Sequence, residues 1–248
     1  MSQTLRIALA AAAVVVVALL GYQFFVGSSP ATTPTPSAAG GVVDLSAGAL
    51  DPGTRYRASR RSDTGSVGFS FAVPTTGWSY DGSFEVIGHA DSPQDTTVWF
   101  YLTSSMYSDA MPITPAVLDD PCAHDAFQTF DPSLAGQAEA LVSIPGTELV
   151  SGPSQVTIDS QPGQYVAIAF PADLGCAISD FWLVFNASCG APTINCGNYP
   201  RWAGETLREW LIMVDDEIFN IRAQVRYPEA GAELEAEIQR IVDSIEFE

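Results

Sequence analysis

Lysine is absent from this sequence of 248 residues, so all ten basic side chains are arginines. Without lysine the chain has no Walker-type phosphate loop, no Schiff-base lysine and no serine–lysine nucleophile pair. Histidine is scarce too, because only His89 and His124 occur. The sequence contains no Gly-x-Ser-x-Gly, no His-Glu-x-x-His and no sortase-like Thr-Leu-x-Thr-Cys pattern. These absences favour a protein without catalytic activity, and no cofactor is predicted.

Positive charge is rare in general. The chain has 29 acidic residues against ten arginines, a net charge of −19. Arg6 is the only charged residue among the first 43, so the remainder carries nine arginines against 29 acids, a net charge of −20. A domain with so negative a field repels the phosphate backbone, which argues against nucleic acid as a partner.

One apolar segment lies at the N-terminus. Ile7–Val26 is apolar except for Gln23, and 20 helical residues span about 30 Å, the thickness of the bilayer core. Arg6 precedes the segment, so the positive-inside rule predicts residues 1–6 in the cytoplasm, a signal-anchor helix at 7–26 in the plasma membrane, and the rest of the chain outside. The alternative is a signal peptide cleaved near Val26-Gly27-Ser28, after which the protein would be secreted.

Residues 27–65 are predicted to be a linker, because the stretch that follows Gly27 is rich in Pro, Ser and Thr and lacks apolar residues to bury. Four arginines lie near its end: Arg55, Arg57, Arg60 and Arg61. They are interpreted either as a contact for an anionic envelope polymer or lipid, or as solvated charge that offsets the acidic domain.

Residues 66–248 are long enough for one extracytoplasmic domain. Alternating apolar residues predict strands at Val67–Val73, Phe84–Gly88 and Thr97–Thr103, and two hairpins, Gln155–Asp159 with Gln164–Phe170 and Thr206–Val214 with Ile218–Tyr227. Helical spacing predicts helices at Ser133–Ser143 and Pro228–Ile245. We therefore expect an α+β fold, an antiparallel sheet with packed helices.

Two of these segments also carry a resemblance. The strand that runs into Pro74-Thr-Thr-Gly-Trp78 and the terminal Ile241-Val-Asp-Ser-Ile-Glu-Phe247 resemble the PsbP-like α/β/α sandwich, and more closely membrane-anchored ectodomains of high-GC Gram-positive bacteria. Further matching stretches begin at Thr157, Pro171 and Trp210. PsbP-like proteins are generally binding or accessory modules, so the resemblance implies a non-catalytic role.

The four cysteines, Cys122, Cys176, Cys189 and Cys196, all lie in the outer domain. An even number outside the membrane indicates disulfides, and three pairings are possible. We favour Cys122–Cys176 with Cys189–Cys196, which would brace a segment rich in Gly, Pro and Asn.

The densest polar cluster is Asp119-Asp-Pro-Cys-Ala-His-Asp125. Cys122, His124 and Asp120 are weak candidates for a zinc site, and the first two for a thiolate–imidazole dyad. The simpler interpretation is an acidic loop that holds a disulfide.

Among the five tryptophans Trp202 is the exception to a predicted core role, because it lies beside Arg201 in a segment that contains Gly and Pro, where an exposed aromatic residue would need a partner. These two residues are the candidates for contact with a ligand. The sequence thus favours a membrane-anchored binding, sensor or accessory module whose extracytoplasmic partner, a protein or an envelope ligand, is unknown. A cell-envelope hydrolase using carboxylates or Cys122 and His124 is the alternative.

Overall fold

The computed structural model describes residues 41–61, 65–82, 86–89, 96–106, 114–190, 197–198, 200–226 and 231–248. They belong to one unit, Ala38–Glu248. The expected cytoplasmic residues 1–6, the membrane segment 7–26 and the first part of the linker lie outside the described residues. In the part of the chain that is described, no helix has the length and apolarity needed to cross a membrane.

An eight-stranded sheet forms the centre of this unit, and all neighbouring strands in it are antiparallel. From edge to edge its strands are β10 (Glu148–Ile158), β11 (Gln161–Ala169), β14 (Thr206–Val214), β15 (Glu217–Val225), β7 (Thr96–Leu102), β6 (Val86–His89), β5 (Trp78–Tyr80) and β2 (Gly48–Ala49).

Both predicted hairpins are present in this sheet. The turns between their strands are Asp159-Ser160 and Asp215-Asp216, and all four of these residues have a positive φ, between 46° and 66°. Two-residue hairpin turns need this conformation at both positions, and aspartate tolerates it better than most residues do. In the first hairpin β11 begins at Gln161, so Pro162 and Gly163 belong to the strand and not to the turn.

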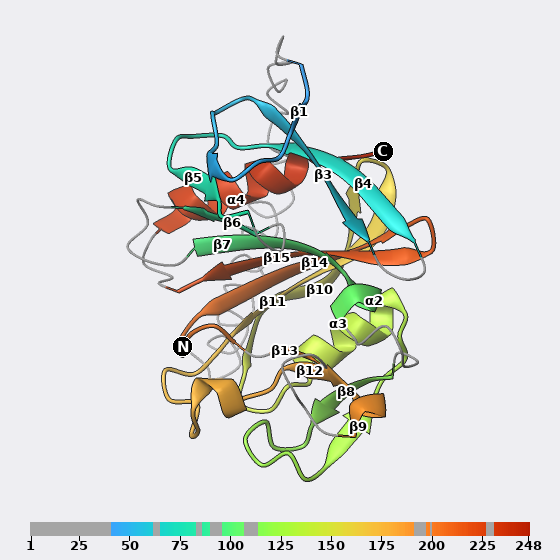
Figure 1. The fold of residues 1–248 in the computed structure, drawn as a ribbon. Helices are drawn as coiled ribbons and strands as arrows, with labels where there is room; N and C mark the ends of the chain where they lie inside the picture. The colour runs from blue at the N-terminus through green and yellow to red at the C-terminus, as the bar shows by residue number, and fades with distance from the viewer. Residues whose placement is uncertain are drawn as a thin grey trace, which may run out of the picture. The chain divides into compact units, whose positions relative to one another are not determined.

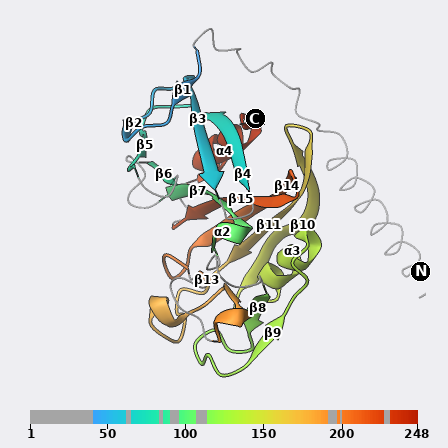
Figure 2. The same cartoon turned by 45° about the vertical axis from the view of Figure 1, so that its right-hand side comes forward.

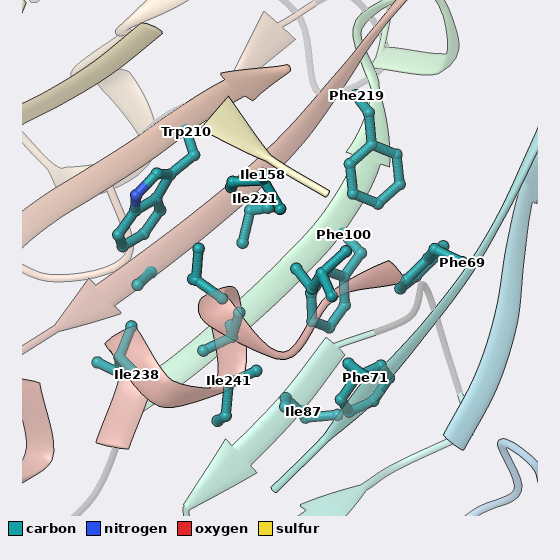
Figure 3. Packing of buried hydrophobic residues seen from close by; sticks show 14 of the residues in the cluster. Phe69, Phe71, Ile87, Phe100, Ile158, Trp210, Phe219, Ile221, Ile238 and Ile241 are labelled. Carbon is teal, nitrogen blue, oxygen red and sulfur yellow. The ribbon is translucent and has the colours of Figure 1, made fainter. Parts of the chain in front are cut away.

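One face of the central sheet packs against α4 (Gly231–Asp243) and a four-stranded sheet with the order β1 (Val43–Asp44), β3 (Arg55–Arg61), β4 (Ser66–Ala72) and β16 (Glu246–Phe247). Phe69 and Phe71 of β4 contact Phe100 of β7, and Ile238 and Ile241 of α4 close the same core (Figure 3). Side chains from all three layers therefore form one continuous apolar cluster.

The opposite face packs against α3 (Leu134–Val142) and a second small sheet, β13 (Gly197–Asn198), β12 (Val184–Asn186), β8 (Pro115–Leu118) and β9 (Phe127–Thr129). Figures 1 and 2 show α4 on one side of the long strands and α3 with β8 and β9 on the other. Three short helical elements complete the described structure: α2 (Thr103–Met106) after β7, η1 (Ile178–Asp180) before β12 and η2 (Ala187–Cys189) after β12. Both faces of the central sheet are therefore covered.

The expected α+β sandwich of a sheet with packed helices is wrong. The described fold is β-rich, with 48% strand and 17% helix. The strands that the sequence analysis missed are short, such as β8, β9, β12 and β13, or carry many arginines, such as β3. Two to four residues give too few alternations for a period of two to be recognised.

The expected linker boundary at residue 65 also needs correction. Within 27–65, β3 pairs with β4 along its whole length, and Leu50 and Tyr56 are buried, at 3% and 7% exposure. Tyr56 and Ala58 pack on the core side of β3. The four arginines on this strand conceal that alternation.

Two of those arginines pair with acids at the C-terminus. Arg55 forms an ion pair with Glu246 at 2.8 Å and Arg57 with Glu248 at 2.8 Å. Both pairs are partly exposed, so screening by solvent keeps their contribution to stability small. The two guanidinium groups are therefore occupied by the protein's own carboxylates.

Candidate functional site

The favoured disulfide Cys122–Cys176 is present. Cys189 is disulfide-bonded as well, and its expected partner Cys196 lies outside the described residues. Because the sulfur of Cys122 is bonded to Cys176, it is not available as a thiolate, which excludes the thiolate–imidazole dyad and zinc ligation through this residue.

The rest of the Asp119–Asp125 loop is held by internal contacts. His124 Nε2 lies 2.6 Å from the backbone carbonyl oxygen of Asp180, and Asp120 Oδ1 accepts a hydrogen bond from the Cys122 backbone N–H at 2.9 Å. No cluster of three or more metal-ligating side chains occurs among the described residues. The loop is a polar turn attached to a disulfide.

The most concentrated chemistry is a buried ion pair in the central sheet that the sequence analysis did not identify. Glu209 of β14 and Arg222 of β15 are 2% and 7% exposed. Arg222 Nε donates to Glu209 Oε2 at 3.0 Å, and Nη2 donates to Oε2 at 2.8 Å and to Oε1 at 3.1 Å. Tyr101 of β7 donates its hydroxyl proton to Glu209 Oε1, and the Arg222 guanidinium lies over the Tyr101 ring.

Burial alone would lower the pKa of Arg222, but the nearby negative charge of Glu209 and the hydrogen bonds between them raise it above its ordinary value. Asn198 of β13 adds an acceptor when its amide oxygen faces the guanidinium, at 2.9 Å from Nη1. The pair is thus compensated on several sides, as a buried charge requires.

A second group of buried polar side chains lies on the other side of a small cavity from the ion pair and reaches α3. Asn220 Nδ2 donates to Thr103 Oγ1 at 2.7 Å, and Thr103 Oγ1 donates to Gln137 Oε1 at 3.1 Å. A cavity of about 20 Å³ lies between these residues and the ion pair. That volume holds about one water molecule, so it has no room for a substrate.

A second buried carboxylate, Glu205, directly precedes β14 and is 0% exposed. It accepts hydrogen bonds from the backbone N–H groups of Arg201 at 3.2 Å and Trp202 at 3.0 Å, and from Gln224 Nε2 at 3.0 Å. Burial raises the pKa of the Glu205 carboxyl to about 7, and these hydrogen bonds, together with the charge of Arg222, oppose the shift. Glu205 therefore fixes the turn that carries the predicted ligand-contact residues.

These contact residues lie together at the edge of this region. The Arg201 guanidinium carbon is 4.6 Å and that of Arg226 is 5.7 Å from the centre of the Trp202 ring. Trp202 is partly exposed, whereas Trp78, Trp182 and Trp210 are buried in the cores. Trp99 is partly exposed as well, so exposure does not single out Trp202, which is distinguished by the two guanidinium groups near its ring.

The sequence does hold a signal for the ion pair. A two-residue turn at Asp215-Asp216 fixes the register of its hairpin, and this register places Glu209 directly opposite Arg222. Opposite charges in such a cross-strand pair attract each other. Sequence reasoning missed the pair because it treated the polar side of β15 only as an alternation and did not follow the register.

No protein-family model matches the sequence, and no curated protein is significantly similar to it. The PsbP-like resemblance therefore stays a prediction, and the functional argument depends on the residues themselves.

The raised pKa of Glu205 predicts a dependence of stability on pH. The folded state binds this proton more tightly than the unfolded chain, whose glutamate titrates near 4.5. The proton therefore stabilises the fold fully below pH 4.5, and this stabilisation, about 3 kcal/mol, is lost as pH rises to about 7.

Denaturation of the wild type and of Glu205→Gln between pH 4.5 and 8 measures this effect. The glutamine variant should lack this component, so the difference in unfolding free energy between the two proteins should change by about 3 kcal/mol across the range. Gln224→Leu removes a bond to the carboxylate and should shift the midpoint to higher pH. A constant difference between wild type and Glu205→Gln would contradict the assignment.

Proposed function

We propose that the protein is a membrane-anchored, extracytoplasmic binding or accessory module. Residues 7–26 span the plasma membrane with the N-terminus in the cytoplasm, and the unit at residues 38–248 lies outside. The observation that carries this proposal is the Cys122–Cys176 disulfide in a chain whose first apolar run is long enough to span a bilayer. Disulfides persist in oxidising compartments, and such a segment delivers a domain to one.

The buried charges support a binding role over a catalytic one. The carboxylate oxygens of Glu209 accept hydrogen bonds from Arg222 and Tyr101. Those of Glu205 accept hydrogen bonds from two backbone N–H groups and from Gln224. A general acid or base must reach the proton that it transfers. Both carboxylates are at most 2% exposed, and the adjoining cavity holds one water molecule, so they stabilise the packing of the sheet.

A hydrolase is the second candidate, and one observation favours it. The pKa of Glu205, about 7, is the value expected of a general acid at neutral pH. A hydrolase of this kind would need a conformation that exposes Glu205, and Glu205→Gln would abolish its turnover.

Localisation is tested by expressing the full chain in a bacterial host and labelling thiols with a maleimide polymer after acid quenching. We expect the wild type in the carbonate-washed membrane fraction with no reactive thiol. Leu19→Glu with Leu20→Glu places charge in the apolar run, so the protein should stay inside with reactive thiols. Thr32→Glu with Thr33→Glu adds the same charge in the linker and should leave export intact.

Reduced wild-type protein in the cytosolic fraction would refute the proposed location. A soluble, oxidised product that lacks the first residues would replace the anchor with a cleaved signal peptide while leaving the domain outside.

A further inference from the structure

Four arginines of the described residues form ion pairs with glutamates of the same chain. Arg55, Arg57, Arg208 and Arg222 pair with Glu246, Glu248, Glu235 and Glu209. Arg201 differs from them. Its side chain is exposed, it forms no ion pair within the described ranges, and its guanidinium lies over the ring of Trp202. In a domain with a net charge of −20, an exposed arginine that contacts a tryptophan in place of a carboxylate is unusual.

Two distant segments bring a second arginine to the same ring. Thr206 at the start of β14 pairs with Val225 at the end of β15, so the turn before β14 and Arg226 after β15 are neighbours. Arg226 thereby comes within 5.7 Å of the Trp202 ring centre. Two guanidinium groups therefore lie near one aromatic ring, which concentrates positive charge at this place on the surface.

Hydrogen bonds to the buried Glu205 carboxylate fix the backbone of the turn that carries Arg201 and Trp202. Both oxygens of the Glu205 carboxylate, buried at 0% exposure, accept bonds from the backbone of Arg201 and Trp202. The side chains of these two residues therefore project from a fixed backbone, which lowers the entropic cost of binding a ligand.

We propose that Arg201, Trp202 and Arg226 form a binding site for an oxyanion, a carboxylate or phosphate group carried by the extracytoplasmic ligand. Arg201 is exposed and its guanidinium lies over the ring of Trp202, and the N–H edge of a guanidinium group matches the two oxygens of a carboxylate or phosphate. The acidic surface elsewhere repels such groups, so an anion is directed to this cluster. This assignment names a ligand class for the binding module proposed above and rests on that function.

The test uses the full chain in detergent, labelled with 5-fluorotryptophan and observed by fluorine NMR. The five tryptophans give five signals, and Trp202→Phe identifies that of Trp202. Sodium citrate and sodium phosphate are titrated separately, each against sodium chloride at equal ionic strength. We expect a saturable shift of the Trp202 signal with at least one of the two, which also tells carboxylate from phosphate recognition.

Arg201→Gln should weaken this binding roughly tenfold, the loss expected for one charge-assisted hydrogen bond. Arg240→Gln is the matched control, because Arg240 is an exposed arginine of α4 and its loss changes the net charge equally. This control should alter the affinity less than twofold, and unchanged signals from the other four tryptophans show that each variant is folded.

The inference is overturned if neither anion moves the Trp202 signal more than chloride does, or if the two arginine variants weaken binding equally. A negative result in the titration and a negative result in the localisation experiment refute different proposals. A negative titration leaves the proposed location intact, whereas a cytosolic, reduced protein would refute the location without affecting the titration.

Discussion

Replacing Arg222 with methionine is expected to lower the free energy of unfolding by about 3–5 kcal/mol, because Glu209 is left buried without its partner. Urea denaturation of the full chain in detergent, followed by tryptophan fluorescence, measures the loss. Arg57→Met is the matched control. It also breaks an arginine–glutamate pair, but one whose side chains are 49% and 42% exposed, so its loss should be far smaller than that of Arg222→Met.

A combined variant separates the ion pair from the shape of the site. Tyr101→Phe, Glu209→Leu and Arg222→Met together remove both charges and the hydroxyl group that donates to Glu209. This variant should recover most of the stability, since apolar groups of similar size often replace a buried ion pair without loss. Equal losses for Arg222→Met and Arg57→Met would show that water reaches Glu209 and would refute the buried cluster.

The second large effect concerns the disulfide. Replacing Cys122 and Cys176 with serine should lower the free energy of unfolding by about 4 kcal/mol, because the cross-link closes a loop between residues 54 positions apart and restricts the unfolded chain. Both cysteines also pack against the second apolar core, with Phe181 and Leu183, so the bond fixes the region that covers the central sheet.

Reduced wild-type protein provides the control for this variant. Under full reduction neither protein has the Cys122–Cys176 cross-link. The free energies of unfolding of the wild type and of the double serine variant should then agree within about 1 kcal/mol. A large difference that persists under reduction would assign the effect to packing of the cysteine side chains instead.

Local patterns were sufficient for several parts of the fold. Asp215-Asp216 between two alternating runs predicted the β14–β15 hairpin, and helical spacing of Leu234, Ile238 and Ile241 predicted the helix that became α4. The disulfide between Cys122 and Cys176 was also predicted and is confirmed. These features depend on neighbouring residues or on a small number of possible pairings.

The candidate site was only partly accessible from the sequence. Trp202 and Arg201 were selected because the aromatic residue and the cation are adjacent in a segment that contains Gly and Pro. Arg226 could not be added to them, because it is 24 positions from Trp202 and reaches the ring only through the pairing of β14 with β15. Glu205 gave no local signal, since its importance comes from burial.

The sequence by itself determined which side chains of β15 share a face: the odd-numbered residues Phe219–Val225 on one side and the even-numbered residues Asn220–Gln224 on the other. Only the tertiary structure decided that the second face is buried too. The elements that cover this face are α3, β12 and β13, and they belong to the part of the chain between β7 and β14. A period of two identifies a face but carries no information about what packs on it. That contact turned a polar strand face into a buried ion pair and raised the pKa of Glu205. It also converted the expected sheet with helices into a central sheet with a smaller sheet on each side.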